Sequence, residues 1–154
     1  MAGQKILLPY NFTTTDRKAL DFVIRTFSKL DDTEVTLYHA YTPAPKIDMR
    51  GSPVMEKMKS QMDQLAMKVY EQEHALKEVK KQLLQGGLSK DRVRHVFEPI
   101  KKDIASDIVV QVSNGNYGVV VLNRKPAKIT RFFTRSIFFK VVSTLQDVTV
   151  CVVS

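Results

Sequence analysis

The stretch that decides the fold is VVVLNRKPAKITRFFTRSI, from Val119 to Ile137. It begins as the short apolar run of a buried strand, turns at Asn123 into a basic loop, and re-enters apolar sequence at Ser136. In α/β proteins, a strand that feeds a cationic loop and then a helix start is a usual place for phosphate groups. The stretch therefore predicts an α/β fold with an anion-binding position after one strand.

On both sides of this stretch, predicted strands alternate with predicted helices. Short runs of strand-forming residues lie at 5–9, 34–41, 90–97, 117–122 and 148–153. Between these runs, apolar residues recur at helical spacing over 16–30, 52–85, 100–112 and 137–145. The alternation predicts an open, five-stranded parallel sheet of strand order 3-2-1-4-5, with helices on both faces. The length fits one domain, residues 1–154.

In that strand order, the loops after the first and fourth strands open at the switch point of the sheet. They are predicted at 9–15 and 123–136, so the basic loop occupies the expected ligand position. The candidate nucleotide- or anion-binding residues of the two loops are Asn11, Thr13, Asn123, Arg124, Lys125, Arg135 and Ser136.

The predicted helix over 52–85 is too long for the sheet beside it. It reaches about 50 Å at 1.5 Å per residue, against about 17–20 Å for a typical strand, so part of it must project or bend. Its apolar seam is rich in methionine from Met55 to Val69 and has one polar member, Gln72. Ordinary core packing along one face is the preferred interpretation, and a protein partner at the Met-rich half is the alternative.

The third and fifth strands are the two edges of the predicted sheet. Protective charges are found on the third strand, at Arg92, Arg94 and His95. The fifth strand is short, apolar and bare, so we expect it to be covered by a second copy of the chain. The residues of this predicted homodimer strand are Val148, Val150 and Val152.

Catalytic or metal chemistry is only weakly indicated. His39 is interpreted as a satisfied core residue and His95 as a solvated one. One helix face carries Glu71, His74 and Glu78, but a metal site built on helices needs several such elements. The sequence has no Walker A motif, nucleophile elbow or Ser-His-Asp order, so we expect a protein that is not an enzyme and has no metal site.

Composition bounds the setting and the partners. The single cysteine, Cys151, excludes an internal disulfide and is expected to be a small buried hydrophobe. No apolar run approaches the ~20 residues of a membrane-spanning helix, and no signal peptide is visible, so a cytoplasmic location is expected. The net charge of +8 includes six positive charges from Arg124 to Lys140 with no acidic residue among them. This charge could meet phosphates, nucleic acid or an acidic membrane, or it could be a solvated basic face with no specific partner. No nucleic-acid-binding module accompanies the charge, so no specific nucleic-acid partner is predicted.

Three segments carry a family resemblance. The opening KILLPYNFT at 5–13 is similar to a motif commonly written ILVPVDFS, VTLYHA at 35–40 is similar to VTLLHV, and 148–153 is similar to a closing CPVLVV strand. In their order and spacing, these segments resemble the universal stress protein family over almost the whole chain. The resemblance implies a Rossmann-like, adenine nucleotide alpha hydrolase-like fold and a dimer.

Nucleotide-binding members of that family carry G-x-x-G, nine residues, then G and Ser or Thr after the fourth strand. The glycines let backbone N–H groups approach phosphates closely. Here the glycine positions are Leu122, Lys125 and Arg135, which bring bulk where phosphates would lie, and Ser136 is kept. The acidic residue of the first loop is replaced by Asn11.

Two explanations of these departures stay open. In the preferred one, the site is closed, so the chain is a dimeric stress-response or regulatory protein without an ATP site or cofactor. In the other, side-chain cations replace the backbone amides, and the protein is a sensor that binds ATP, AMP or another anion.

Overall fold

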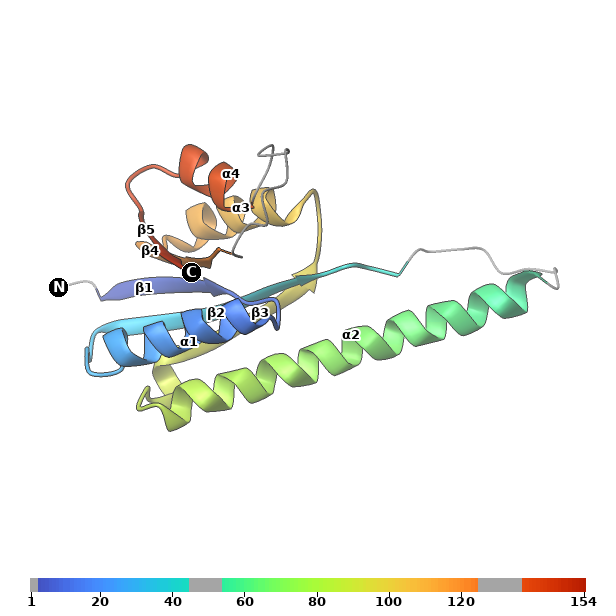
Figure 1. Ribbon diagram of the computed structural model, residues 1–154, viewed down its shortest axis with the longest axis horizontal. Helices are drawn as coiled ribbons and strands as arrows, with labels where there is room; N and C mark the ends of the chain where they lie inside the picture. The colour runs from blue at the N-terminus through green and yellow to red at the C-terminus, as the bar shows by residue number, and fades with distance from the viewer. Residues whose placement is uncertain (1–2, 45–53, 125–136) are drawn as a thin grey trace.

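The computed structural model describes residues 3–44, 54–124 and 137–154, which form a central parallel sheet with helices on its two faces (Figure 1). The strand order is β3-β2-β1-β4-β5, and every strand pair is parallel. The fold class and the strand order predicted from the sequence are therefore confirmed. The strands are β1 (Gln4–Pro9), β2 (Thr33–Tyr41), β3 (Val93–Pro99), β4 (Val119–Asn123) and β5 (Thr149–Val153).

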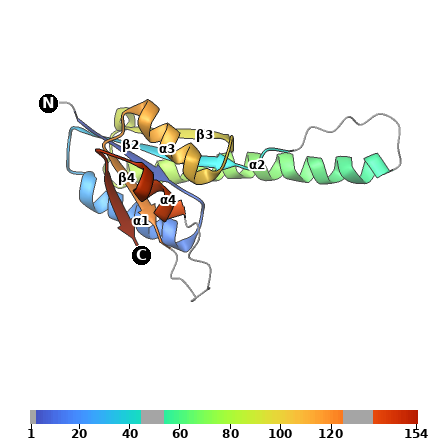
Figure 2. The ribbon, with the colours of Figure 1, turned by 90° about the horizontal axis from the view of Figure 1, so that it is seen from above.

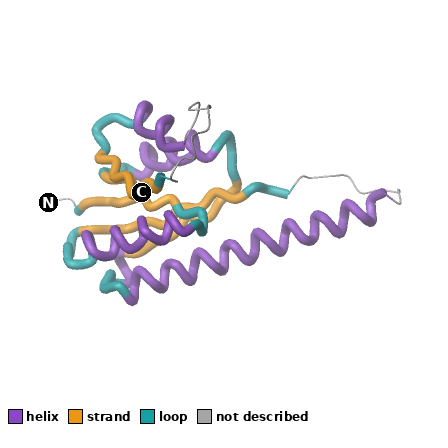
Figure 3. The backbone as a smooth tube through the Cα atoms, in the orientation of Figure 1, coloured by secondary structure: helices purple, strands orange, loops and turns teal. Residues whose placement is uncertain are grey.

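Two helices cover each face of the sheet (Figures 1 and 3). Helices α1 and α2 share one core cluster with the sheet, and α3 and α4 share the other. Neighbouring residues of β1 divide between the clusters, with Ile6 and Leu8 in the first and Leu7 in the second. This explains why the strand is a continuous apolar run, as expected for a strand buried on both faces. The helices are α1 (Thr14–Phe27), α2 (Val54–Gln85), α3 (Ile104–Gly115) and α4 (Ile137–Thr144).

Helix α2 packs on the sheet only through its C-terminal half, and its other half projects beyond the sheet (Figure 2). Leu76, Val79 and Leu83 are buried, whereas Leu65 is 39% exposed and Tyr70 is 71% exposed. The prediction that part of the helix projects is confirmed. The preferred interpretation of core packing along the whole seam is wrong for the Met-rich half, because the sheet does not extend beneath it. None of the described helices combines the length and apolar character needed to cross a membrane.

The start of the third strand differs from the prediction. Residues 90–92 form a short 3-10 turn, η1 (Lys90–Arg92), and β3 begins at Val93. Arg92 Nε donates to the carbonyl of Thr33 at 2.8 Å, and the same guanidinium donates to the carbonyls of Phe27 and Leu30. Arg92 therefore ties down the turn between α1 and β2, and it does not act as a free charge guarding the sheet edge.

The side chain of His95 corrects the prediction of a solvated histidine. It is half-buried, and its buried Nδ1 atom finds no hydrogen-bond partner among the residues that the structure describes. The reason is that α2 packs over β3, which brings Lys77 and Lys80 near the ring. Burial and these two ammonium groups lower the pKa of His95.

Strand β5 is an edge strand, as predicted, and some of its side chains pack into the core. Val148 lies just before the strand, and Val148 and Val150 pack against the cluster formed with α3 and α4. Val152 is 40% exposed. Cys151 is half-buried rather than fully buried, and burial raises the pKa of its thiol. Pairing with a second copy stays a prediction.

Candidate functional site

The candidate site lies at the carboxyl ends of β1 and β4, where the strand order reverses. Thr13 is the N-cap of α1 and Asn123 is the last residue of β4. Asn11 and Arg124 are exposed beside them, and the backbone N–H of Arg124 donates to the carbonyl of Val153 at 2.7 Å. The other predicted site residues lie outside the described residues: Lys125, Arg135 and Ser136.

Thr13 and Asp16 close the amino end of α1 by bonding to each other. Asp16 N donates to the hydroxyl of Thr13 at 3.2 Å, and its carboxylate accepts from Thr13 N at 3.0 Å and from the Thr13 hydroxyl. This reciprocal arrangement is a capping box, which satisfies two backbone donors that a helix start would otherwise leave open. Asp16 thus serves the positive end of the helix from the third helical position.

Asn123 extends this network across the switch point. Its side-chain Nδ2 donates to the second carboxylate oxygen of Asp16, which lies 107 residues earlier in the chain. Asp16 is only 2% exposed, so both of its oxygens are used by the protein itself. The end of β4 and the start of α1 are therefore joined at the switch point.

This network decides the local electrostatics. A free helix start offers N–H groups and a partial positive charge to an anion. At the start of α1, the carboxylate of Asp16 already occupies the place of the anion. A phosphate placed there would therefore meet a negative charge. The arrangement disfavours phosphate at the first switch-point loop.

The loop after β1 is also filled by aromatic packing. Phe12 has φ +60°, a left-handed backbone that is uncommon for a bulky residue. Its ring lies 5.4 Å from the ring of Tyr10 and 5.0 Å from that of His39. The row continues from His39 to Phe97 at 5.7 Å and from Phe97 to Tyr41 at 4.6 Å. The aromatic row, defined as Tyr10, Phe12, His39, Phe97 and Tyr41, therefore runs over the carboxyl ends of β1, β2 and β3.

His39 is a buried core residue, as predicted, but only one of its nitrogens is satisfied. The ring is 4% exposed, and Nδ1 donates to the carbonyl of Tyr10 at 2.8 Å. Nε2 is buried without a hydrogen-bond partner in the described part of the chain. Burial lowers the pKa of His39, and the Tyr10 carbonyl and the Asp16 carboxylate oppose that effect only in part.

Two expectations about the fourth strand and its basic loop are corrected. Leu122 is buried in the cluster of α3 and α4, on the face away from Asn123, so its bulk does not fill the phosphate position. Lys140 is not an unbalanced charge of the loop, because its Nζ lies 3.0 Å from a carboxylate oxygen of Asp103 and 2.7 Å from the hydroxyl of Ser106. Hydrogen bonds from Ser106 and Lys140 lower the pKa of Asp103 to about 2.

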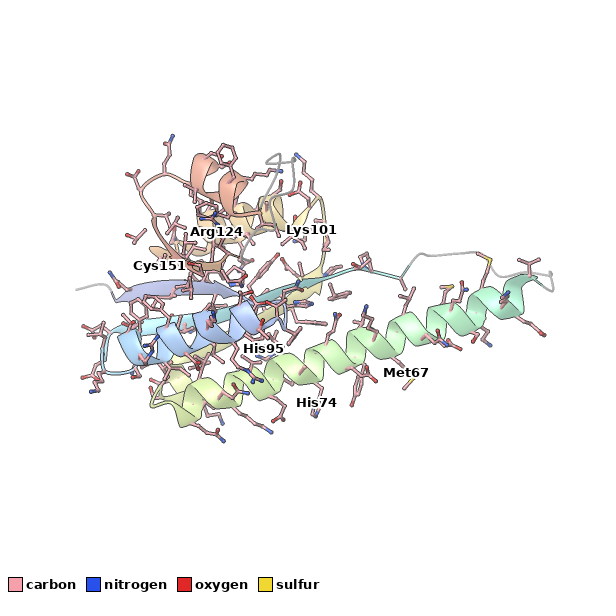
Figure 4. All side chains as sticks on the ribbon, viewed as in Figure 1. Met67, His74, His95, Lys101, Arg124 and Cys151 are labelled. Carbon is pink, nitrogen blue, oxygen red and sulfur yellow. The ribbon has the colours of Figure 1, made fainter. Side chains whose placement is uncertain are left out.

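A groove of about 510 Å³ lies beside the switch point, between the start of α1 and the middle of α2. The face with Glu71, His74 and Glu78, noted in the sequence, lines one wall, and Arg17 lies on the other. Among the described residues, no three histidine, cysteine or acidic side chains come together as a metal site. Figure 4 shows the side chains on the ribbon, with His74 of α2 and His95 of β3 labelled.

Sequence reasoning missed the bond between Asp16 and Asn123. One half of it had a signal, since Thr13 and Asp16 have the spacing of a capping box. The partner from β4 had no local signal, because the two residues meet only when β4 pairs with β1.

Neither a protein-family model nor a curated protein matches the chain. Solved structures do. One is a hypothetical protein whose biochemical function was assigned from its structure, with TM-score 0.71 and 20% identity over 99% of this chain and 96% of that one. A universal stress protein in complex with cAMP has TM-score 0.65 and 13% identity over 100% and 98% of the two chains. A universal stress protein family protein from Arabidopsis thaliana with AMP bound has TM-score 0.61 and 12% identity over 97% and 90%.

These likenesses extend along nearly the whole of both chains, and they agree with the observed strand order. At these identities they speak to the fold. The fold of this chain is that of the universal stress proteins.

Proposed function

We propose that the chain is a non-enzymatic, dimeric, cytoplasmic stress-response or regulatory protein of the universal stress protein type, with no working ATP site. The observation that carries the proposal is the bond between Asp16 and Asn123. It joins the two elements that flank the switch point, and it uses the last free oxygen of a buried carboxylate.

The chemistry of phosphate binding supports the same conclusion. A nucleotide needs backbone N–H groups or cations close to its phosphates. At the β1 side, the start of α1 is already capped by Thr13 and Asp16. At the β4 side, Lys125 and Arg135 stand at two of the family glycine positions, and Leu122, at the third, is buried in the cluster of α3 and α4. Binding would therefore require the chain to give up its own hydrogen bonds.

A second candidate is a sensor of adenine nucleotides or another anion. Two similar structures carry cAMP and AMP, which makes this the main competing function. Arg124 is exposed at the end of β4, and Lys125 and Arg135 follow in the sequence, so side-chain cations could take the place of glycine N–H groups. The two candidates differ in whether a nucleotide or another anion is bound at the switch point.

We predict that the purified protein carries no nucleotide. Its absorbance at 260 nm should be that of protein alone, and mass spectrometry after denaturation should find no adenine nucleotide. A nucleotide present at close to one per chain would favour the sensor.

A variant of the basic loop separates the two candidates further. Lys125→Gly with Arg135→Gly restores two of the family glycines, and Lys128→Gly with Arg131→Gly removes the same charge at other positions. Gain of ATP binding in the first variant alone supports a closed ancestral site. Loss of an existing ligand in the first variant supports the anion sensor.

The proposed dimer uses the edge of β5. Thr149 N donates to the carbonyl of Gly118, and the carbonyl of Val153 accepts from Arg124 N. Because backbone groups alternate along a strand, those of Val150 and Val152 face away from β4. A second copy of β5 could pair with them.

We expect the mass in solution to be that of two chains of 17.6 kDa, measured by size exclusion with light scattering at micromolar concentration. Val152→Pro removes an outward N–H group and should shift the protein to a monomer, because proline is tolerated at an edge but cannot donate. Val152→Thr keeps the N–H group and should remain a dimer. A wild-type monomer would refute the predicted dimer.

The projecting half of α2 is the proposed surface for a protein partner. Leu65, Met67 and Tyr70 are exposed there, and methionine adapts to irregular surfaces. The projecting half of α2 extends away from the sheet (Figure 1), and partner binding there needs no nucleotide at the switch point.

A further inference from the structure

The contact between α2 and the sheet contains two histidines that the proposed function does not use. In the pairing of β2 with β3, Leu37 lies opposite His95 and His39 lies opposite Phe97. Leu37 and Phe97 belong to the cluster that α2 covers, so both histidines lie on that face of the sheet. Each ring has one buried nitrogen without a hydrogen-bond partner in the described part of the chain: His39 Nε2 and His95 Nδ1.

We propose that the contact between α2 and the sheet is pH-sensitive. Helix α2 stays packed on the sheet while His39 and His95 are neutral, and it is released when acid protonates them. The α2 joint is defined here as His39, His95, Gln72, Lys77 and Lys80. The inference goes beyond the proposed function and does not depend on whether a nucleotide binds.

His39 supplies the more deeply buried half of the joint. Its Nδ1 must carry the hydrogen, because the carbonyl of Tyr10 can only accept. The Gln72 side chain of α2 lies near the ring and favours its protonated form, and Nε2 has no hydrogen-bond partner in the described part of the chain. Protonation would place a charge between the rings of Phe12 and Phe97, where burial outweighs the Tyr10 carbonyl, the Asp16 carboxylate and the Gln72 side chain that favour it.

His95, once protonated, would repel positively charged side chains of α2. The charges of Lys80 and Lys77 of α2 act against its protonated form, and Glu73 of the same helix, which lies 3.8 Å from Lys77, acts in favour of it. A protonated His95 would bring three positive charges together across the contact between β3 and α2. Like charges at a partly buried contact destabilise it, and separation of the helix from the sheet relieves the repulsion.

The direction of the pH effect follows from the lowered pKa of both rings. When α2 is released, the rings reach water and return toward the ordinary pKa of about 6.5. Below that pH, the state with α2 released binds protons that the packed state does not bind. The packing of α2 on the sheet therefore becomes less stable as the pH falls. Toward neutral pH and above, both rings lose their protons in both states, and the packing of α2 on the sheet is most stable.

Release would change what the molecule presents to a partner. The buried stripe of α2, with Leu76, Val79 and Leu83, would become continuous with the exposed residues of its projecting half. The aromatic row on the sheet would be uncovered at the same time.

Hydrogen exchange measured by mass spectrometry tests this joint in the intact protein. After correction for intrinsic rates, exchange in 72–85 should rise roughly tenfold between about pH 7.5 and about pH 5, while exchange in α3 stays unchanged. The double variant His39→Asn with His95→Asn should lose most of this rise. His74→Gln removes the exposed histidine of the same helix and should keep it in full.

The ring pKa values give a second measurement that needs no variant. Titration of the three histidine rings by NMR in the wild-type protein should show His39 and His95 below about 6.5. Values at or above that for both rings would overturn the proposal. Parallel changes of α2 and α3 with pH, or loss of the effect in His74→Gln, would overturn it as well.

Discussion

Replacing Leu76 with alanine is expected to lower the free energy of unfolding by about 2–5 kcal/mol. Leu76 is fully buried in the cluster between α2 and the sheet, and truncation would leave a cavity in a close-packed interior. It sits where α2 first reaches the sheet, so this one side chain anchors a helix whose preceding half has little support.

Leu65 is the matched control for that prediction. It lies on the same helix and in the same seam, but it is 39% exposed on the projecting half. The change Leu65→Ala should therefore cost less than about 1 kcal/mol. Urea denaturation of both variants measures the difference. Equal losses for the two variants would mean that the projecting half is packed in solution, by a partner copy or by the chain itself.

Replacing Asp16 with alanine is expected to cost about 2–4 kcal/mol. The loss combines the N-terminal cap of α1, worth about 1 kcal/mol, with the Asn123 amide left unpaired at about 1–3 kcal/mol. Both groups lie where water cannot easily replace the carboxylate, since Asp16 is 2% exposed and Asn123 is half-buried.

A double-mutant cycle with Asn123→Ala isolates the contact between the two elements. The coupling energy should fall between about 0.5 and 3 kcal/mol if the pair is bonded in solution. Asp21→Ala, which removes an exposed carboxylate of the same helix, should change stability by no more than about 0.5 kcal/mol. A coupling energy of zero would show that the switch point is not joined in this way.

The fold could be predicted well from the sequence because its strands and helices carry strong local patterns. The runs around Leu7 and Val120 are apolar without interruption, as expected for strands covered on both sides. The heptad-like seam of α2 was equally clear, but periodicity reports only that one face is apolar. Whether a sheet lies beneath Leu65 depends on where β2 and β3 end, and the helix sequence does not contain that information.

The site was less predictable because its contacts join residues distant in the sequence. Asn123 was expected to meet a ligand, and its amide instead bonds to Asp16. His95 was expected to be solvated because it alternates with charges on an edge strand. That alternation does not reveal that α2 packs over β3. Arg92 looked like a charge guarding an edge, although a guanidinium near three carbonyls binds them instead.

Isothermal titration of the purified protein with ATP and AMP tests whether the switch point of this universal stress protein fold is closed, as we propose. Low salt is the strict condition, because screening of the basic loop is then weakest. We expect no saturable heat up to about 1 mM nucleotide. Saturable binding near one nucleotide per chain, with Kd of about 10 μM or lower, would contradict it.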